Sequence, residues 1–303
     1  MTSRHAYLLM VHKSIGQVEK LCRLLDDNRN DLYVHVDDNV RDVDIWQTRL
    51  HNAVKNAKLV FVPRVAVSWG GFSQIKAELS LLDTAVNDRT HTYYHLISGA
   101  DLPLRNQDQI HSFFDMHQGK EFVSLGTLDY QKTIESRVRY WYIWQEYIGN
   151  AHSTLRRILR KVQRAYIALQ RVFDVNLNSH NDIKHYYGGA NWFSITESFA
   201  IYILAHRDWI HDTFRKGKCV DEVFVQTLLL NSEFSENRYL GVQFDDGPYS
   251  IMRDIDWKRG HPYVWRSGDF NELISSDFLF ARKFDEDIDG NIIDRIYKFV
   301  VAE

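Results

Sequence analysis

The chain has 303 residues, 45% of them hydrophobic, and can therefore bury a full core as one large domain or as two closely packed halves. Its formal net charge of -3 at pH 7 argues against nucleic acid as a partner, because polyanion-binding proteins carry a basic excess. The two cysteines cannot form a disulfide framework. The apolar run 6–11 is too short for a signal peptide or a membrane anchor. We therefore expect a protein of a reducing cytoplasm.

In the first part of the chain, buried strands are predicted to alternate with amphipathic helices. Short apolar runs predict strands at 6–11, 31–38, 59–63, 93–98 and 121–125. Apolar residues at helical spacing predict helices at 14–25, with Ser14 as the N-cap, and at 73–86. This alternation indicates an α/β fold with a mostly parallel central sheet flanked by helices.

Polar residues follow the carboxyl ends of these predicted strands. They are His12 and Lys13 after the first strand, Asp37 and Asp38 at the end of the second, and Asp101 after the fourth. Ligands of open α/β sheets bind beyond these strand ends. No glycine-rich loop follows the first strand, so the sequence has neither a Rossmann fingerprint nor a P-loop.

A basic amphipathic helix is predicted at 153–173. Its apolar face comprises Leu155, Ile158, Leu159, Val162, Tyr166, Leu169 and Phe173, and its cations are Arg156, Arg157, Arg160, Lys161, Arg164 and Arg171. No acidic residue occurs between positions 151 and 173. Two interpretations stay open: a solvated helix packed on the domain, or a surface that contacts anionic lipid or a lipid-linked substrate.

Two carboxylates and a tryptophan are candidates for function in the second half. The stretch GGANWFS predicts a glycine turn and a short strand, in which Trp192 belongs either to the core or to a flat platform for a sugar. The stretch CVDEVFVQTLL places Asp221 and Glu222 at the opening of a helix. In the first turn, Glu222 either complements the positive helix end or acts as a catalytic carboxylate.

The stretch FLFARKFDEDIDG sets Arg282 and Lys283 between an apolar run and an acidic string. Phosphates require charge-assisted donors such as Arg and Lys, so this pair either faces a cleft or forms a solvated surface. The acids reproduce the start of a calcium-binding loop, but Ile296 stands where the closing glutamate belongs. We therefore do not expect calcium.

Six blocks in order resemble glycosyltransferase family 14, which contains the core 2 and I-branching β-1,6-N-acetylglucosaminyltransferases and the peptide O-xylosyltransferases. The blocks are LYVHVDD, VSWGGFSQIKAELSLL, YYHLISGADLPLRNQDQI, YYGGANWFSIT, CVDEVFVQTLL and FLFARKFDEDID, whereas the segment 127–185 does not align. The resemblance implies a GT-A-like fold with 1–303 as a single domain. It also implies a nucleotide-binding half (1–125) and an acceptor and catalytic half (126–303).

The resemblance further implies inverting transfer of a sugar from a UDP-sugar to an acceptor hydroxyl. Neither a cofactor nor a divalent metal is expected, because basic side chains neutralise the diphosphate in this family. Glu222 corresponds to the catalytic base. For the diphosphate, the resemblance implies Arg282, Lys283 and Arg266, with Arg266 preferred over Arg259. For the nucleotide on the uridine side and the donor sugar, it implies Val11, His12, Asp37 and Asp101. For the acceptor, it implies Trp192 and Asp221.

The resemblance leaves the donor sugar open between N-acetylglucosamine and xylose. Without disulfides or an anchor, the chain is similar to a bacterial member that builds surface polysaccharide. We therefore expect a saccharide or lipid-linked saccharide acceptor at the inner face of the cell membrane, with the basic helix in contact with anionic lipid. Two rival functions are a glycoside hydrolase, which would use two of the carboxylates Asp101, Asp221 and Glu222, and a non-catalytic carbohydrate-binding protein.

Overall fold

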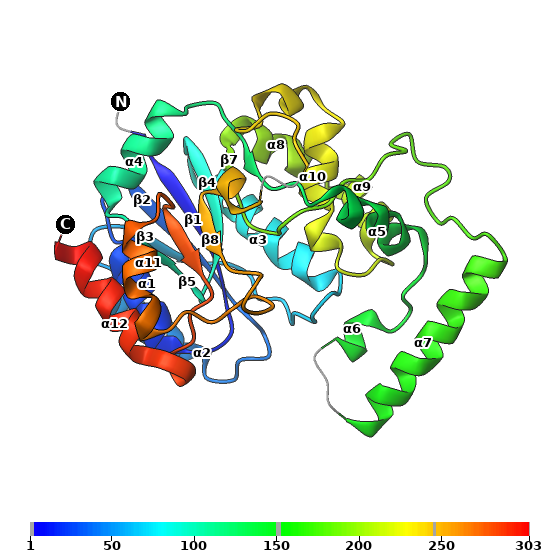
Figure 1. Ribbon diagram of the computed structural model, residues 1–303, viewed down its shortest axis with the longest axis horizontal. Coiled ribbons are helices and arrows are strands. Elements are labelled where there is room, and N and C mark those ends of the chain that lie inside the picture. The colour runs from blue at the N-terminus through cyan, green and yellow to red at the C-terminus, as the bar shows by residue number, and fades with distance from the viewer. Residues whose placement is uncertain (1–2, 150–152, 245–246, 303) are drawn as a thin grey trace.

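The computed structural model of the protein describes residues 3–149, 153–244 and 247–302. Its central sheet has the strand order β3-β2-β1-β4-β7-β6 (Figure 1). The strands are β1 (His5–Val11), β2 (Asn30–Val36), β3 (Lys58–Phe61), β4 (Tyr93–Ser98), β6 (Phe122–Val123) and β7 (Phe193–Thr196). Strands β1 to β4 pair in parallel, whereas β7 is antiparallel to both β4 and β6. The predicted α/β fold with a mostly parallel sheet is thus confirmed.

Helices cover both faces of this sheet. One layer contains α1 (Ile15–Leu24), α2 (Val43–Ala53), α4 (Gln107–Met116), α11 (Phe270–Ser275) and α12 (Glu286–Ala302). The other contains α3 (Ser73–Asp88), α5 (Leu128–Arg139), α8 (Glu197–Ala205), α9 (Arg207–Phe214) and α10 (Phe224–Leu230). Helices α6 (Gln145–Ile148) and α7 (Thr154–Val172) lie to one side of these layers (Figure 1). Four short 3-10 helices of the described residues are η1 (Val220–Glu222), η2 (Glu233–Asn237), η3 (Gly247–Ile251) and η4 (Ser267–Asp269).

Strand β1 shows how the sheet is anchored. Its alternating side chains Tyr7, Leu9 and Val11 enter one hydrophobic cluster, and Ala6 and Leu8 enter the other. Both faces of the strand are therefore covered, which explains why its sequence reads as a continuous apolar run instead of an alternating one. Ser14, the predicted N-cap of α1, lies at the N-cap position, but its side chain caps no backbone N–H group.

A second, three-stranded sheet joins distant parts of the chain. It has the order β5-β9-β8, with β5 (Asp101–Pro103), β8 (Arg253–Ile255) and β9 (Phe280–Arg282). The C-terminal residues from Met252 to Val300 share a hydrophobic cluster with the first half of the chain. The predicted boundary at residue 125 therefore does not coincide with the boundary between the two clusters.

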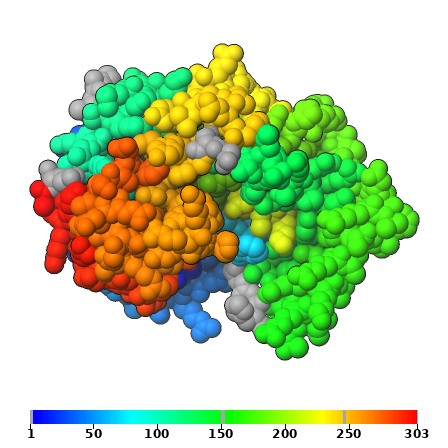
Figure 2. Space-filling model, in the orientation of Figure 1, coloured from blue at the N-terminus to red at the C-terminus, as the bar shows by residue number. Residues whose placement is uncertain are grey.

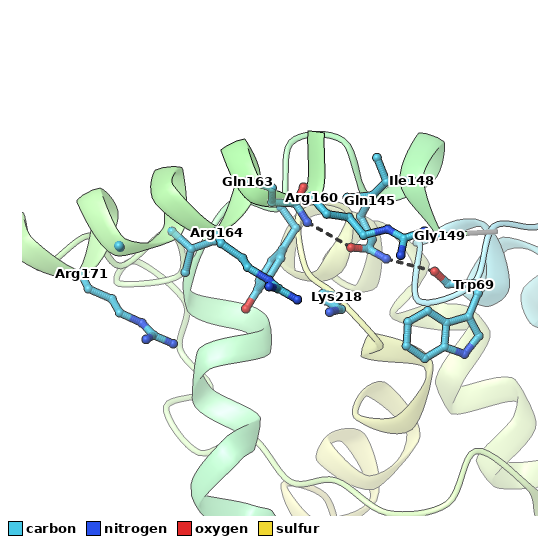
Figure 3. A pocket seen from close by; sticks show the side chains of 12 residues that line it. Trp69, Gln145, Ile148, Gly149, Arg160, Gln163, Arg164, Arg171 and Lys218 are labelled. Carbon is cyan, nitrogen blue, oxygen red and sulfur yellow. Dashed lines mark hydrogen bonds between the residues drawn. The ribbon is translucent and has the colours of Figure 1, made fainter. Parts of the chain in front are cut away.

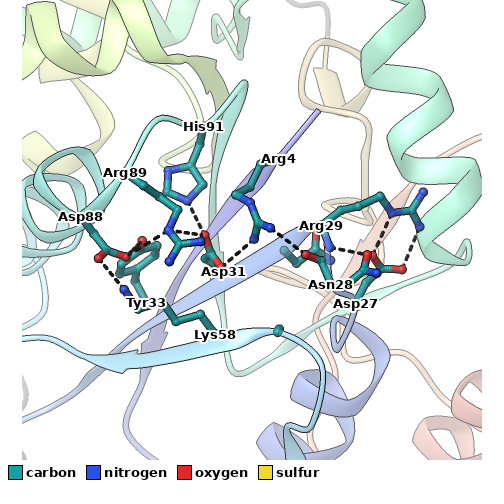
Figure 4. Close-up of polar contacts among 12 residues, drawn as sticks. Arg4, Asp27, Asn28, Arg29, Asp31, Tyr33, Lys58, Asp88, Arg89 and His91 are labelled. Carbon is teal, nitrogen blue, oxygen red and sulfur yellow. Dashed lines mark hydrogen bonds and ion pairs between the residues drawn. The ribbon is translucent and has the colours of Figure 1, made fainter. Parts of the chain in front are cut away.

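The amino ends of the strands are closed by ion pairs (Figure 4). Asp31 is fully buried there and accepts hydrogen bonds from Arg4 at 3.0 Å and from His91 at 2.9 Å, and Arg89 lies 3.4 Å away. These charges neutralise one another within the fold. The polar residues expected to bind ligand lie at the opposite, carboxyl ends.

Helix α7 confirms the predicted basic helix, but most of its predicted apolar face is not packed against the domain. The space-filling view places it at one extremity of the molecule (Figure 2). The buried residues of this helix are Gln163, Ile167 and Gln170, and much of the predicted apolar face is exposed to solvent. In the described part of the chain, no helix is both long and apolar enough to span a bilayer.

Candidate active site

Three cations gather beyond the carboxyl ends of β1 and β4. Arg282 ends β9, and its partner across β5 is Asp101, which follows β4. Lys13 follows β1, and its Nζ lies 2.7 Å from Asp285. The pKa of Lys283 is lowered by partial burial and by the neighbouring charges of Arg282 and Lys13. A site that concentrates positive charge in this way favours a polyanionic ligand, because an anion relieves the mutual repulsion.

Asp101 lies beneath these cations and not in contact with solvent. It is fully buried and accepts hydrogen bonds from the backbone N and the Oγ of Ser98, both at 2.6 Å, and from Arg282 at 3.2 Å. Its other oxygen lies 3.6 Å from Arg253. The predicted direct contact of Asp101 with the donor therefore does not fit its burial, and its carboxylate contacts Arg282 and Arg253 instead.

Arg253 was missed by the sequence analysis. It is fully buried and donates to the backbone oxygen of Leu96 at 3.1 Å. Burial lowers its pKa to about 10, which leaves it charged at neutral pH. A single Arg in the short strand β8 carries no motif, so only its neighbours in the fold reveal it.

Trp192 packs against the cations. Its ring centre lies 4.3 Å from the guanidinium carbon of Arg282 and 5.3 Å from that of Arg253, which is the range of cation–π attraction. The ring is partly exposed. Trp192 also packs against the hydrophobic cluster on the α3 side of the sheet, so the structure supports both alternatives, and direct contact with a sugar stays a prediction.

The three residues predicted for the uridine side lie together at the ends of β1 and β2. The backbone oxygen of Val11 accepts a hydrogen bond from the Asp37 N at 2.9 Å, which holds the two strand ends side by side. His12 is exposed and lies close enough to Asp37, Arg282 and Lys283 to experience their charges. The structure thus brings this predicted group together with the cations.

The backbone of Arg266 lies beside the cations, because the backbone N of the preceding Trp265 donates to the Lys283 oxygen at 3.0 Å. Arg266 is exposed just before η4, and among the described residues it forms no ion pair. Arg259, the alternative, is surrounded by acids: it pairs with Asp256, with Asp269 at 2.7 Å and with Glu272 at 3.1 Å. The acids occupy Arg259, so Arg266 stays the preferred prediction.

Glu222 lies in η1 and not in the first turn of a helix, because α10 begins only at Phe224. Glu222 therefore directly precedes the N-cap residue of α10, Val223, and does not lie in the first turn of that helix as predicted. Its Oε2 instead accepts hydrogen bonds from the Tyr130 hydroxyl and from Arg137, both at 2.6 Å, and the side chain is 37% exposed. Tyr130 and Arg137 lie two turns apart on one face of α5, in the segment that the sequence analysis could not align.

A glycine segment links Glu222 to the cations. The Gly189 N donates to the backbone oxygen of Glu222 at 3.0 Å, and three residues further on Trp192 contacts Arg282. A Cβ at Gly189 would lie 1.9 Å from the backbone oxygen of Ser124, so only glycine allows this close approach. One short segment therefore connects the backbone of Glu222 with the cationic cluster.

Two further carboxyl groups lie beneath Glu222. Asp221 is buried and accepts a hydrogen bond from Gln74 at 2.8 Å, and burial followed by repulsion from Glu222 raises its pKa to about 7. Glu78 of α3 is fully buried, and burial followed by the proximity of Asp221 raises its pKa well above the usual range. The predicted acceptor contact of Asp221 is thus inconsistent with its burial.

A cavity of about 480 Å³ lies between α6, α7 and the loop before η1. Its lining includes Trp69 and the cations Arg160, Arg164, Arg171 and Lys218, and no acid (Figure 3). Lys218 precedes Cys219, whose backbone oxygen accepts a hydrogen bond from Arg137 at 3.2 Å. Arg137 therefore bonds both to the residue after Lys218 and to the carboxylate of Glu222.

The described residues offer no cluster of three or more His, Cys, Asp or Glu side chains that could hold a metal ion. The acids of the calcium-like string serve other purposes. Asp285 pairs with Lys13, and Asp289 accepts hydrogen bonds from the backbone N and the Oγ of Ser267 at 2.8 and 2.9 Å.

Comparison with known proteins identifies the family. Rat xylosyltransferase 2 is 23% identical over 315 residues, which cover 96% of this chain and 33% of that protein. Human N-acetyllactosaminide beta-1,6-N-acetylglucosaminyl-transferase is 25% identical over 304 residues, covering 92% of this chain and 68% of that protein. The chain thus spans about a third of the length of the xylosyltransferase.

Among solved structures, apo mouse xyloside xylosyltransferase 1 aligns with a TM-score of 0.35 and 9% identity, over 91% of this chain and 96% of that one. The family model described as Branch, Core-2/I-Branching enzyme, matches residues 5–269, most of the chain. The protein therefore belongs to the Core-2/I-Branching enzyme family.

Proposed function

We propose that this protein is an inverting glycosyltransferase that transfers a sugar from a UDP-sugar to an acceptor hydroxyl without a divalent metal. The observation that carries the proposal is the cluster of Lys13, Arg282 and Lys283 at the strand ends, joined through one glycine segment to the backbone of Glu222. N-acetylglucosamine and xylose are the proposed donor sugars, because similar proteins are named for their transfer.

The cations suit the departure of a nucleotide diphosphate. As the bond to the sugar breaks, negative charge grows on the leaving UDP, and fixed positive groups stabilise this transition state more than the ground state. Asp101, the carboxylate that follows β4 beside these cations, already accepts hydrogen bonds from Ser98 and Arg282. This engagement supports the proposal that side chains, and not a metal ion, neutralise the phosphates.

Glu222 is the proposed general base. Its carboxylate takes the proton of the acceptor hydroxyl while the hydroxyl oxygen attacks the anomeric carbon from the face opposite UDP, which inverts the configuration. The hydrogen bonds from Tyr130 and Arg137 fix the carboxylate on its exposed side. The buried Asp221 and Glu78 support this loop from below.

The cavity lined by α7 is the proposed acceptor side. Its cations and the Trp69 ring suit a saccharide that carries an anionic group, such as the phosphate of a lipid-linked saccharide. A role in bacterial surface polysaccharide synthesis stays a prediction from the sequence.

The test is a panel of UDP-sugars assayed for UDP release in the presence of EDTA, together with the variant Glu222→Gln. We expect this variant to lose activity by about 10²-fold to 10⁴-fold while it keeps its affinity for UDP, because only the base is removed. Glu236→Gln, at an exposed position of η2, is the matched control and should retain full activity.

Near-normal turnover of Glu222→Gln would overturn the assignment of the base. Loss of all activity in EDTA, restored by Mn²⁺, would overturn metal independence. Hydrolysis of a glycoside with no nucleotide present would favour the rival hydrolase.

A further inference from the structure

Helix α7 exposes an apolar stripe that points away from the rest of the molecule. The stripe consists of Leu155, Ile158, Val162, Leu169, Val172 and Phe173, and each of these side chains is between 45% and 80% exposed. They recur at spacings of three and four residues and therefore form one continuous face. A helix of a globular protein normally buries such a face.

Polar side chains attach this helix to the rest of the protein. Gln170 exchanges hydrogen bonds with the backbone of Trp141 at 2.9 and 3.1 Å, and Gln163 accepts one from the Trp144 N at 3.2 Å. Ile167 is buried beside them. These specific bonds fix the rotation of α7, so the outward direction of the stripe is set by the fold and is not an accident of loose packing.

The charged residues of α7 are all basic. The helix carries Arg156, Arg157, Arg160, Lys161, Arg164 and Arg171, and no acidic residue. A helix that faces only water usually mixes both signs of charge, because like charges repel along its face. An apolar stripe combined with a purely basic polar face is typical of helices that lie in the interface of an anionic membrane.

We propose that the α7 stripe docks this protein on a membrane surface that contains anionic lipids. The apolar side chains enter the boundary between headgroups and acyl chains, and Arg157 and Lys161, both exposed beside the stripe, contact the lipid phosphates. A second copy of the chain is a less suitable partner, because pairing two α7 helices would bring two basic helices together with no acid on either one.

Docking in this way has a consequence for the acceptor side. Arg160, Arg164 and Arg171 lie on the other side of α7 and line the cavity shown in Figure 3. A protein held by the stripe would thus keep this cavity within one helix diameter, about 10 Å, of the lipid surface. The docking itself does not depend on the proposed function and can be tested without a donor.

The experiment is co-sedimentation of the full chain with phosphatidylcholine vesicles that contain either no phosphatidylglycerol or 30% of it. We expect binding to the anionic vesicles, weaker binding to neutral ones, and a fall in binding as salt rises. The variant Ile158→Asn/Val162→Asn/Leu169→Asn should lower the partition coefficient at least tenfold, because less apolar surface enters the membrane. Arg157→Gln/Lys161→Gln should lower it about tenfold at low salt only.

The matched control is Ile45→Asn/Ile201→Asn/Val301→Asn, which removes three equally exposed apolar side chains outside α7 and should bind like the wild type. Because every substituted position is exposed, circular dichroism and Tm should show that all variants fold. Equal binding of the α7 triple variant and the wild type would overturn the proposal. A wild-type dimer in size-exclusion chromatography that becomes monomeric in the α7 variant, without vesicle binding, would assign the stripe to a second copy instead.

Discussion

Asp101→Asn tests how the cationic cluster is supported. Asp101 is 0% exposed and Arg253 is 1% exposed, so the variant leaves a buried guanidinium beside a neutral amide. Removing one partner of a buried ion pair costs about 3 kcal/mol or more, since the remaining charge is not compensated. For a protein of this size, a loss of about 3 kcal/mol lowers Tm by about 5 °C, which differential scanning fluorimetry can measure.

The same variant should weaken binding of UDP. Arg282 loses the carboxylate that positions it at the site, and a charge-assisted hydrogen bond is worth about 1.5 kcal/mol or more. If Arg282 contacts the diphosphate, we expect the Kd for UDP, measured by isothermal titration calorimetry, to rise about tenfold.

Asp31→Asn is the matched control, because Asp31 is equally buried and also pairs with cations, but at the amino ends of the strands. It should lose stability without a change in the Kd for UDP. An unchanged Tm of Asp101→Asn would refute the buried pair. Equal Kd values for the two variants would refute the positioning of Arg282 by Asp101.

Two further predictions concern the loop around Glu222. Because burial and the neighbouring Glu222 raise the pKa of Asp221 to about 7, its contribution to the free energy of unfolding is present at pH 4 and is lost as the pH rises to 7. The wild type should therefore lose about 2 to 3 kcal/mol more of its free energy of unfolding between pH 5 and pH 8 than Asp221→Asn does, as measured by urea unfolding. An identical loss in the wild type and the variant would contradict a buried, protonated Asp221. Gly189→Ala should cost about 2 kcal/mol, because its Cβ would meet the Ser124 backbone, whereas Gly268→Ala has nothing within 4 Å and should stay within about 0.5 kcal/mol. Equal Tm values of the two alanine variants would show that the loop can move aside.

The regular elements of the central sheet could be predicted from sequence, because their signal is local. The apolar runs of β1, β2 and β4 and the helical spacing of α1, α3 and α7 match the observed elements to within a few residues. The three-residue strands β5 and β8 are different. They are too short to show a period, and β8 exists only because β9 lies beside it.

The candidate site could be predicted only in part, because its contacts join residues that are far apart in the sequence. Arg282, Lys283 and Glu222 were identified from motifs, whereas the partners that orient them come from distant positions. Asp101 and Arg282 lie 181 residues apart, and Arg137 and Glu222 lie 85 apart.

The sequence by itself therefore determined the strands of the central sheet, the helices α1, α3 and α7, and which side chains carry charge. The tertiary structure decided that Asp101 and Asp221 are buried beneath the site, that α5 supplies the partners of Glu222, and that α7 turns its apolar stripe outward. Burial and ion pairing depend on which distant segments pack together, and the local period of a sequence fixes only which residues share a face, not what that face contacts.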